Sequence, residues 1–557
     1  MKEHIYKIAL LLFSICFLFI MIHSEYKKEG MGERARIYFQ IGEETIQTWE
    51  KDGVHYLFVP SFATEEDMVL TSYSPEFFII HQGEKISGNE KIGDLLKEQN
   101  IDCQFVESKE KFKLCILQSE NIPAVFIDTW SGGLKELKAD KEYIVSGTVN
   151  VVDESGQWQE KMALRSIGGR GNTSFAGYEK KPFSIILNEP CSLVGLPTGQ
   201  KYALISNASD PSLIRNDIVR RMEMALELPY SHTGKFVDLY INGEYEGNYY
   251  LCDDIEIGQE RIAINDMESA MDLIYQNANY ESEEIYETET VKARKIPVNP
   301  VDISGGYLME REYSQRFEYE YPQISSAFIT DSEEHFVMKS PRYCSQEQIE
   351  YIHQYVNEAE KAILSADGRN HKTGKSYQDY IDVDSFVKKY LTEEVSKNYD
   401  AGVSSSYFFK DSDLNGGKLC AGPGWDYDMS LGNYVDWMEE FSADPTGISE
   451  LAFHTYASPW YTALYQKDEF YELVEKYYWK AVEPFLQELL TGGIDNYAEM
   501  LGASAKMNEI RWQEELDANP YYKNRNQTFV ELKEFLEARK DYLDEAWRSG
   551  VPSGTVS

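Results

Sequence analysis

The amino-acid sequence predicts a mixed α+β protein with more than one domain. Short alternating apolar segments between turn residues fill the first part of the chain. A strand–glycine loop–strand pattern follows, and helical periodicity dominates the C-terminal part. A chain of 557 residues also exceeds what one hydrophobic core usually supports. We therefore expect a small β-rich domain at residues 35–120, a core domain at 121–440 and a helical region at 441–557.

The N-terminal segment has the pattern of an export signal. Two lysines precede an unbroken apolar run, Ile8–Ile22, and a charged stretch follows it. Because no small-x-small cleavage site follows, we expect residues 1–23 to form an uncleaved signal anchor and residues 24–34 a linker. A cleaved signal peptide or a buried N-terminal helix are the alternatives. The body is then membrane-anchored or secreted, outside the cytoplasm. Basic residues flank the apolar run on both sides, so the positive-inside rule leaves the orientation open.

Composition excludes some partners. The formal net charge is −40, and no concentration of Lys or Arg offers a surface for a nucleic-acid backbone. Basic protein partners, or a solvated extracellular surface, are compatible with this charge. No two of the seven cysteines have CxxC spacing, so a zinc knuckle is not expected. Cys103 and Cys115 could form a local disulfide in an oxidising compartment, but scattered thiols are the expected state.

Strand patterns account for the first domain and the start of the second. The first domain carries no group of residues that suggests chemistry, so we expect a spacer or a binding module. Hydrophobic alternation between turn residues marks the expected strands, which are Ile37–Phe39, His55–Val59, Phe77–His81, Phe112–Leu117, Ala124–Asp128 and Tyr143–Val152.

A glycine-rich loop lies within Met162–Leu187, between two expected strands. Three glycines precede Lys180 and Lys181, which begin the second strand. Glycines let backbone N–H groups approach phosphates, and a lysine neutralises them. The stretch is not a Walker A loop, because no helix follows a GK[ST] sequence. It is not a Rossmann fingerprint either, because the glycine spacing differs. A glycine-bearing β-hairpin with surface lysines explains the same pattern.

The next segment combines a helix, a hairpin and a polar stretch. A helix-start signal at Asp210 places Arg215 and Asn216 in the first turns of a helix. A clear β-hairpin, Phe236–Leu251, then ends just before two aspartates. The polar stretch Asn277–Pro300 is interpreted as an inserted loop or lid. Helical spacing recurs later, at Gln346–Leu364, Asp384–Lys397, Phe453–Leu464, Phe470–Leu490, Tyr497–Leu516 and Phe529–Trp547.

Three aspartates flank a predicted hairpin near the middle of the second half. Asp400 precedes the strand-like run Ser406–Lys410, and Asp426 and Asp428 follow the short run Lys418–Ala421. A hairpin folds one end back beside the other, so these carboxylates can converge. Converging carboxylates can hold Mg²⁺ and take the proton of an attacking hydroxyl. An acidic surface hairpin in a very acidic protein is the alternative interpretation.

Several long motifs occur in a fixed order. GRGN is followed by KKPF, LVGLP, YALISNASDPSLIRN and FVDLYINGEYEGNYYL, and then by NYD, SSYFFKD and GWDYDMSLGN. In this order the motifs resemble the CotH family, the atypical spore-coat kinases and their secreted relatives. They run from Gly168 to Asn433, about half of the chain, and leave residues 24–120 and 441–557 outside the resemblance.

The resemblance implies an atypical protein-kinase-like fold with a Gly-rich β-hairpin loop. It implies use of ATP with Mg²⁺ or Mn²⁺ to phosphorylate Ser or Thr in protein substrates of the cell envelope or spore coat. The acidic composition suggests that the acceptor is basic and Ser-rich. The expected location is the cell envelope or the spore surface, with membrane contact through the N-terminal apolar segment.

The resemblance also implies roles on the nucleotide side. Lys180 or Lys181 would contact the phosphates, and only one can point inward because side chains alternate along a strand. Asp253 would orient that lysine, although relatives usually carry Glu at this position. Arg215 and Asn216 would brace the site or reach a phosphate. The loop that would cover the phosphates consists of Gly168, Gly169, Arg170, Gly171 and Asn172.

On the acceptor side, Asp400 would be the base towards the hydroxyl. Asp426 would be the chief metal ligand, and Asp428 a second ligand or a residue behind it. The departure at Asp253 leaves three alternatives. These are a pseudokinase without turnover, a structural coat or envelope protein that recruits basic partners, and a different phosphoryl or nucleotidyl transfer. Because Asp400, Asp426 and a candidate lysine are retained, we favour an active enzyme.

Overall fold

The computed structural model describes most of the chain in two compact units. The described residues are 37–70, 77–87, 90–96, 98–276, 278–320, 325–401, 404–433, 443–448, 459–518 and 524–548. The predicted signal anchor and linker, residues 1–34, lie outside this range. Within it, no helix is both long and apolar enough to cross a bilayer. The first unit contains the described residues up to Val59, Ala63–Gln118 and Gly243–Tyr245, and the second contains the rest.

The first unit consists of two antiparallel-rich sheets with the orders β2-β1-β5 and β3-β4-β9-β8-β6-β7. In β9, Phe112, Leu114 and Ile116 are buried while the residues between them are more exposed, as alternation predicts. Cys103 and Cys115 are free thiols, as are the other cysteines in the described ranges. The strands are β1 Tyr38–Ile41, β2 Glu44–Gln47, β3 Trp49–Lys51, β4 Val54–Val59, β5 Met68–Leu70, β6 Phe77–His81, β7 Glu84–Ser87, β8 Ile101–Phe105 and β9 Lys111–Gln118.

The second unit begins with a closed barrel of order β10-β11-β12-β13-β14-β16-β15. Its interior is filled by aliphatic and aromatic side chains from alternate strand positions, such as Val125, Leu164 and Ile185. Parallel pairing of the first strand with β15 closes the ring. The strands are β10 Ala124–Thr129, β11 Ile144–Val152, β12 Met162–Gly169, β13 Phe183–Cys191, β14 Gly199–Ile205, β15 Gly234–Ile241 and β16 Glu244–Asp253.

A seven-stranded sheet, β17-β18-β20-β21-β19-β22-β23, forms the second layer of this unit. The predicted hairpin before Asp426 is present, with β22 antiparallel to β23. The loop or lid predicted for Asn277–Pro300 is wrong. Part of it forms β17 and β18, because Val291 and Ala293 are buried against the sheet. The strands are β17 Ile285–Glu287, β18 Val291–Arg294, β19 Tyr307–Glu312, β20 Ala327–Ile329, β21 His335–Ser340, β22 Ser406–Lys410 and β23 Leu419–Ala421.

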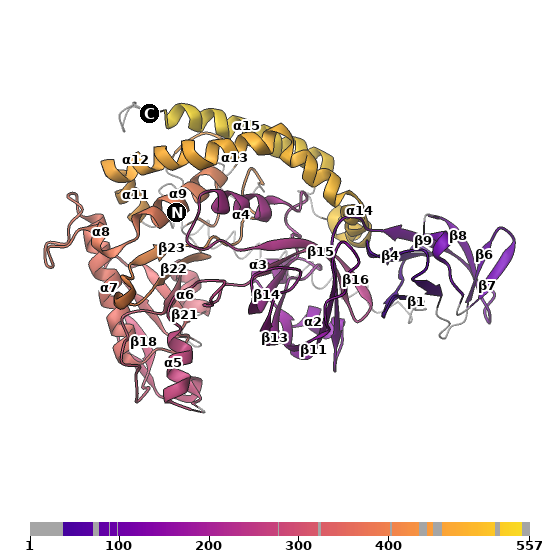
Figure 1. The fold of residues 1–557 in the computed structure, drawn as a ribbon, viewed down its shortest axis with the longest axis horizontal. Helices are drawn as coiled ribbons and strands as arrows, with labels where there is room; N and C mark the ends of the chain where they lie inside the picture. The colour runs from indigo at the N-terminus through magenta and orange to yellow at the C-terminus, as the bar shows by residue number, and fades with distance from the viewer. Residues whose placement is uncertain are drawn as a thin grey trace, which may run out of the picture. The chain divides into compact units, whose positions relative to one another are not determined.

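Helices cover this sheet and continue as far as Ala546. The helix predicted at Gln346–Leu364 has those bounds, and Ser345 caps it by accepting a hydrogen bond from the Gln348 N–H. The C-terminal helices share one hydrophobic cluster with the sheet, so they belong to the same unit. Figure 1 shows α13 and α15 running side by side. The main helices are α4 Arg215–Ala225, α7 Gln346–Leu364, α9 Val383–Ser396, α11 Pro459–Tyr465, α12 Asp468–Tyr477, α13 Glu483–Glu488, α14 Ile494–Ala518 and α15 Arg525–Ala546.

A buried ion pair joins α15 to α9. Arg539 is 0% exposed and donates to the Glu394 carboxylate at 2.8 Å. The same guanidinium donates to the carbonyl oxygens of Pro445 at 2.9 Å and Gly447 at 2.7 Å. A buried guanidinium with this many acceptors ties the C-terminal helix to the helix that leads to Asp400.

We expect Arg539→Met to lower the free energy of unfolding by about 3–5 kcal/mol, because it leaves the Glu394 carboxylate buried without its charged partner. Denaturant unfolding would measure the change. Lys533→Met, on the same helix as Arg539, is the matched control: it breaks an exposed pair with Asp495 on α14, and we expect a loss below about 1 kcal/mol. Equal losses in the two variants would contradict the prediction.

Candidate active site

The glycine-rich loop is shaped by its own packing. β12 ends at Gly169, and the short helix α3 (Thr173–Gly177) lies between it and β13. The loop thus contains a short helix that the sequence pattern does not predict, and the two strands pair antiparallel. A Cβ on Gly169 would lie 2.3 Å from the Phe175 ring, and Gly171 has φ +71°. Both positions thus require glycine for this turn.

The two candidate lysines point to different neighbours. The Lys180 ammonium donates to the carbonyl oxygens of Ser206 at 2.7 Å and Asn248 at 2.5 Å. The Lys181 ammonium donates to the Phe175 carbonyl at 2.7 Å. Both side chains are buried. Both lysines lie just before β13, which begins at Phe183, so the prediction that they begin this strand is wrong. One ammonium nevertheless lies against the barrel strand β16 and the other against α3.

Asp253 does not pair with a lysine. It accepts hydrogen bonds from the Tyr230 hydroxyl and the Thr233 N–H, and the His232 Nδ1 lies 3.6 Å from its Oδ2. These partners include no lysine from the described part of the chain, so the predicted lysine–Asp253 pair is not formed. The reason is distance along β16: Lys180 reaches Asn248, five residues before Asp253, or roughly 17 Å along a strand. Burial raises the pKa of Asp253 to about 7.

The β22–β23 hairpin brings the three predicted aspartates together. The Tyr399 N–H, next to Asp400, donates to the carbonyl of Met429, next to Asp428, at 3.1 Å. Burial and then the charge of Asp428 raise the pKa of Asp400 to about 6. Burial and then the charge of Asp426 raise the pKa of Asp428 to about 7. Mutual repulsion of this kind arises only between carboxylates that lie close together.

Asp426 has an unusual backbone and two arginines near it. Its φ is +69°, a left-handed conformation that is uncommon for a residue other than glycine. The Arg170 guanidinium lies 4.6 Å from the Trp425 ring centroid, and its Nη1 is buried with no hydrogen-bond partner among the described residues. Burial and the Asp400 charge raise the pKa of Asp426, whereas the charges of Arg170 and Arg316 oppose that rise.

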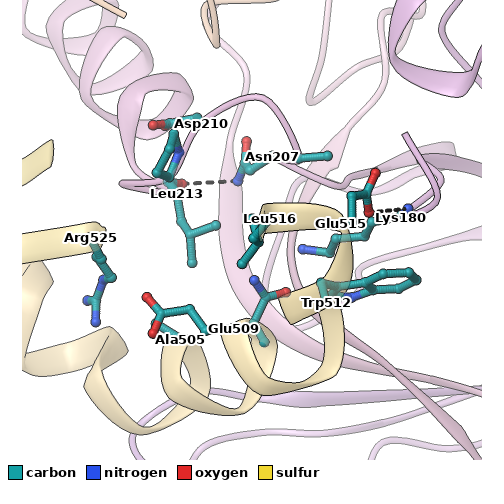
Figure 2. A pocket seen from close by; sticks show the side chains of 13 residues that line it. Lys180, Asn207, Asp210, Leu213, Ala505, Glu509, Trp512, Glu515, Leu516 and Arg525 are labelled. Atoms are coloured by element: carbon teal, nitrogen blue, oxygen red, sulfur yellow. Dashed lines mark hydrogen bonds between the residues drawn. The ribbon is translucent and has the colours of Figure 1, made fainter. Parts of the chain in front are cut away.

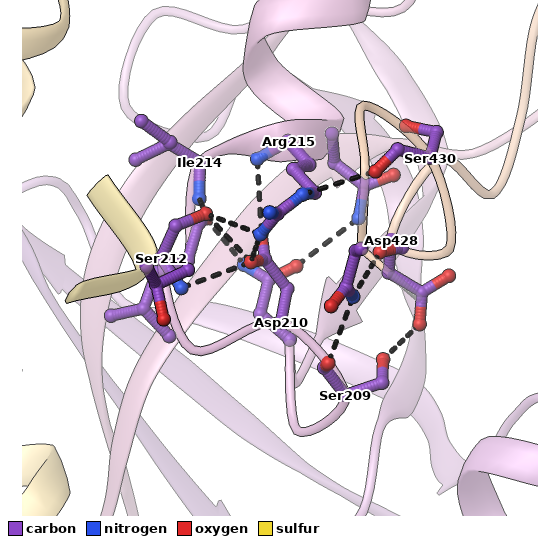
Figure 3. Close-up of polar contacts among 12 residues, drawn as sticks. Ser209, Asp210, Ser212, Ile214, Arg215, Asp428 and Ser430 are labelled. Atoms are coloured by element: carbon purple, nitrogen blue, oxygen red, sulfur yellow. Dashed lines mark hydrogen bonds and ion pairs between the residues drawn. The ribbon is translucent and has the colours of Figure 1, made fainter. Parts of the chain in front are cut away.

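A polar network after β14 holds the aspartate loop (Figure 3). The Ser209 hydroxyl donates to the Asp428 carboxylate. Arg215 pairs with Asp210, and its Nε donates to the Ser430 carbonyl at 3.1 Å. The Asn216 Oδ1 accepts the Tyr427 N–H at 2.8 Å. The contacts of Arg215 and Asn216 are thus to the protein itself.

Tyr427 separates the two aspartates of the loop and fixes their direction. Its ring is buried, and its hydroxyl donates to the Glu393 carboxylate on α9 at 2.9 Å. Asp426 keeps solvent-exposed surface and Asp428 is partly buried, although surrounding protein atoms desolvate both carboxylates. The buried Tyr427 ring thus anchors the loop to the core, with a more accessible aspartate on each side.

The aspartates have the chemistry of a hard-cation site. In the ranges that the structure describes, no set of three or more His, Cys, Asp or Glu side chains forms a ready metal cage. Mg²⁺ bound with a nucleotide needs only one or two carboxylates, since phosphates and waters supply the other oxygens. Asp426 and Asp428 fit that donor set, and a cation between them would relieve the repulsion that raises their pKa values.

Sequence reasoning missed Arg316 and Ser209. Arg316 lies in α6 (Ser314–Glu320), and its charge opposes the rise in the pKa of Asp400. No motif surrounds it. Ser209 lies within the SNASDPS stretch, so its sequence position was visible, but its contact with Asp428 spans more than two hundred residues. Only folding brings the two together.

The repulsion among the aspartates predicts a pH-dependent stability. The pKa of Asp400 is raised to about 6 in the folded state. Its contribution to the free energy of unfolding is therefore fully present below about pH 4, and it is lost as pH rises through 6. Asp400→Asn removes this loss. We expect the variant to gain about 1–3 kcal/mol over the wild type between pH 4 and pH 8.

Urea unfolding at several pH values would test this. Glu537→Gln, which neutralises an exposed carboxylate on α15, is the control. Its free energy of unfolding should change with pH in the same way as that of the wild type. A parallel profile for Asp400→Asn would contradict the prediction.

A family model described as CotH kinase protein matches residues 167–543. The match begins at the glycine-rich stretch, includes the aspartate hairpin and continues through α14 into α15. It therefore extends beyond Asn433, where the recognisable motifs end. No curated protein matches the chain.

Proposed function

Because this chain belongs to the CotH kinase family, we propose that it is an ATP- and divalent-metal-dependent kinase that phosphorylates Ser or Thr hydroxyls of protein substrates. The observation that carries the proposal is the convergence of Asp400, Asp426 and Asp428 beside two arginines. Phosphoryl transfer depends mostly on positioning and charge neutralisation, so a site of this size suffices.

Asp426 and Asp428 would hold the metal ion. A bound Mg²⁺ or Mn²⁺ would supply charge neutralisation for the phosphates. The protein orients both ligands before binding: the Ser209 hydroxyl holds Asp428, and the Tyr427 N–H bonded to Asn216 fixes the backbone between the two ligands. Such preorganisation lowers the cost of assembling the site.

Asp400 would accept the proton of the acceptor hydroxyl. Its pKa, raised to about 6 by burial and by Asp428, leaves it mostly ionised at neutral pH yet more basic than an ordinary aspartate, as a general base requires. Arg170 and Arg316 would oppose negative charge at the site. Arg170 has a buried donor, Nη1, without a partner in the described chain, and this donor suits a phosphate oxygen.

Composition supports the proposed acceptor class and location. A net charge of −40 suits a basic, Ser-rich acceptor. The apolar N-terminal run suits attachment at the cell envelope or the spore surface, with the body outside the cytoplasm. A second candidate is a nucleotide-binding protein without turnover. The absence of a lysine among the described partners of Asp253 favours it, because the expected lysine–carboxylate pair is missing.

We expect Asp426→Ala to lower phosphoryl transfer by about 100-fold or more, because it removes the chief metal ligand. The assay would use the body of the protein, γ-labelled ATP, Mg²⁺ or Mn²⁺ and a basic Ser-rich acceptor. Asp413→Ala, in the exposed turn of the same hairpin, should retain wild-type activity. Wild-type activity in Asp426→Ala would sink the metal-ligand assignment.

Metal and nucleotide together should stabilise the fold. At about 100 times the dissociation constant, Mg²⁺ with a non-hydrolysable ATP analogue should add about 2.7 kcal/mol. In thermal unfolding, the two ligands should raise the Tm of the wild type and of Asp413→Ala. They should leave the Tm of Asp428→Asn almost unchanged. A raised Tm without any phosphoryl transfer would favour the nucleotide-binding alternative, and an equal rise in Asp428→Asn would contradict its role as a ligand.

A further inference from the structure

One face of α14 is polar and contacts the barrel strand β16. Ser504, Asn508 and Trp512 are spaced by four residues, so they lie along one side of the helix, and Glu515 follows a kink at Trp512. A polar stripe inside a packed interface is costly unless each group finds a partner. Here each of the four does.

The first three members bind the strand where its backbone is irregular. Gly247 has φ +112°, and a Cβ there would lie 2.5 Å from the Asn508 Oδ1. The Asn508 Oδ1 accepts the Asn248 N–H at 3.2 Å, and the Trp512 Nε1 donates to the Glu246 carbonyl at 2.9 Å. Ser504 accepts from the Asn248 amide at 2.9 Å. The helix therefore holds the strand segment whose carbonyl binds Lys180.

The last member, Glu515, binds the backbone of Lys180, whereas β16 binds its ammonium. Its carboxylate accepts the N–H of Glu179 at 2.6 Å and the N–H of Lys180 at 3.2 Å. The Lys180 ammonium meanwhile rests on the carbonyls of Ser206 and Asn248. α14 thus fixes this lysine at its backbone directly and at its ammonium through β16. An ammonium has three donor hydrogens, and these two carbonyls use two of them.

Lys180 and Glu515 line one pocket (Figure 2), together with Asn207, Ala208 and Asp210. Asn207, Ala208 and Asp210 lie on either side of Ser209, whose hydroxyl donates to the Asp428 carboxylate. One short loop therefore borders both the lysine pocket and the aspartate site. A phosphate group bound through a metal ion at the aspartates would lie near the loop that this lysine already contacts through Ser206.

The charges of acidic groups on three elements act on the Lys180 ammonium. They are Glu515 on α14, Glu246 on β16 and Asp238 on β15. Burial lowers the pKa of Lys180 to about 7, and among the three carboxylates Glu515 opposes this most strongly. Lys138 and Arg511 already pair with Glu246, and Ser504 donates to Asp238 at 2.7 Å. Glu515 is thus the acid best placed to keep the lysine charged.

We propose that Glu515 is the positioning residue that keeps Lys180 in place and charged for contact with the nucleotide phosphates. This is the part that sequence reasoning gave to Asp253. The proposal rests on the proposed kinase function and adds that the C-terminal helix α14 completes the nucleotide side of the site. Kinases use a lysine positioned by an acidic residue for phosphate binding, and here the acid contacts the lysine through its backbone N–H.

The test compares Glu515→Gln with Glu514→Gln, which neutralises an exposed neighbour on the same helix. Lysines labelled with ¹³C at Cε would be titrated by NMR, and Lys180→Met would identify the Lys180 signal. We expect the Lys180 midpoint to fall by about one pH unit in Glu515→Gln and to stay unchanged in the control.

Binding of Mg²⁺–ATP by calorimetry provides the second measurement. We expect Glu515→Gln to raise the Kd about tenfold at pH 8 and less at pH 6, because fewer lysines carry a proton at the higher pH. A general loss of folding would instead raise the Kd equally at both pH values, and that result would overturn the proposal. So would a Lys180 midpoint that does not move.

The two proposals fail in different ways. A wild type that binds Mg²⁺–ATP but transfers no phosphate would contradict the kinase activity and leave the Glu515 test intact. A wild type that transfers phosphate, with Glu515→Gln matching Glu514→Gln in midpoint and Kd, would overturn the role of Glu515 and leave the kinase activity standing.

Discussion

Electrostatic repulsion among Asp400, Asp426 and Asp428 is the constraint on which the site depends. Three carboxylates whose charges act on one another, with raised pKa values, are unfavourable unless the surrounding structure holds them. Unfavourable gathering of like charges is typical of functional sites, because a cation or a proton then binds there strongly. The fold can be understood as the means by which this arrangement is held.

Several elements from distant parts of the chain hold it. The β22–β23 hairpin turns the chain back, and the end of α9 bonds to the loop through Tyr399 and Met429. Arg215 and Asn216 anchor the same loop from the start of α4. Arg539 then locks α15 onto α9. A rigid support of this kind explains why the family match includes the C-terminal helices.

The nucleotide side is organised differently. Glycine-loop residues come from the barrel, whereas the acid that faces the lysine backbone, Glu515, comes from a helix more than three hundred residues later. Asp253, which the hairpin motif placed beside the lysine, instead bonds Tyr230 and Thr233. Lys180 contacts β16 at Asn248, in the middle of the strand, whereas Asp253 is at its end. The distance between these two positions is too long for an Asp253–Lys180 contact. Position along a strand decides such pairings, not motif order.

The sequence by itself determined the elements and the family. Periodicity located α7 and the β22–β23 hairpin, and the ordered motifs identified the CotH family. These features depend on residues close in sequence. Only the tertiary structure decided that Asn277–Pro300 contributes strands, that Ser209 holds Asp428, and that Glu515 rather than Asp253 faces Lys180. Such contacts join segments far apart along the chain, and no local pattern encodes which distant partner will be nearest.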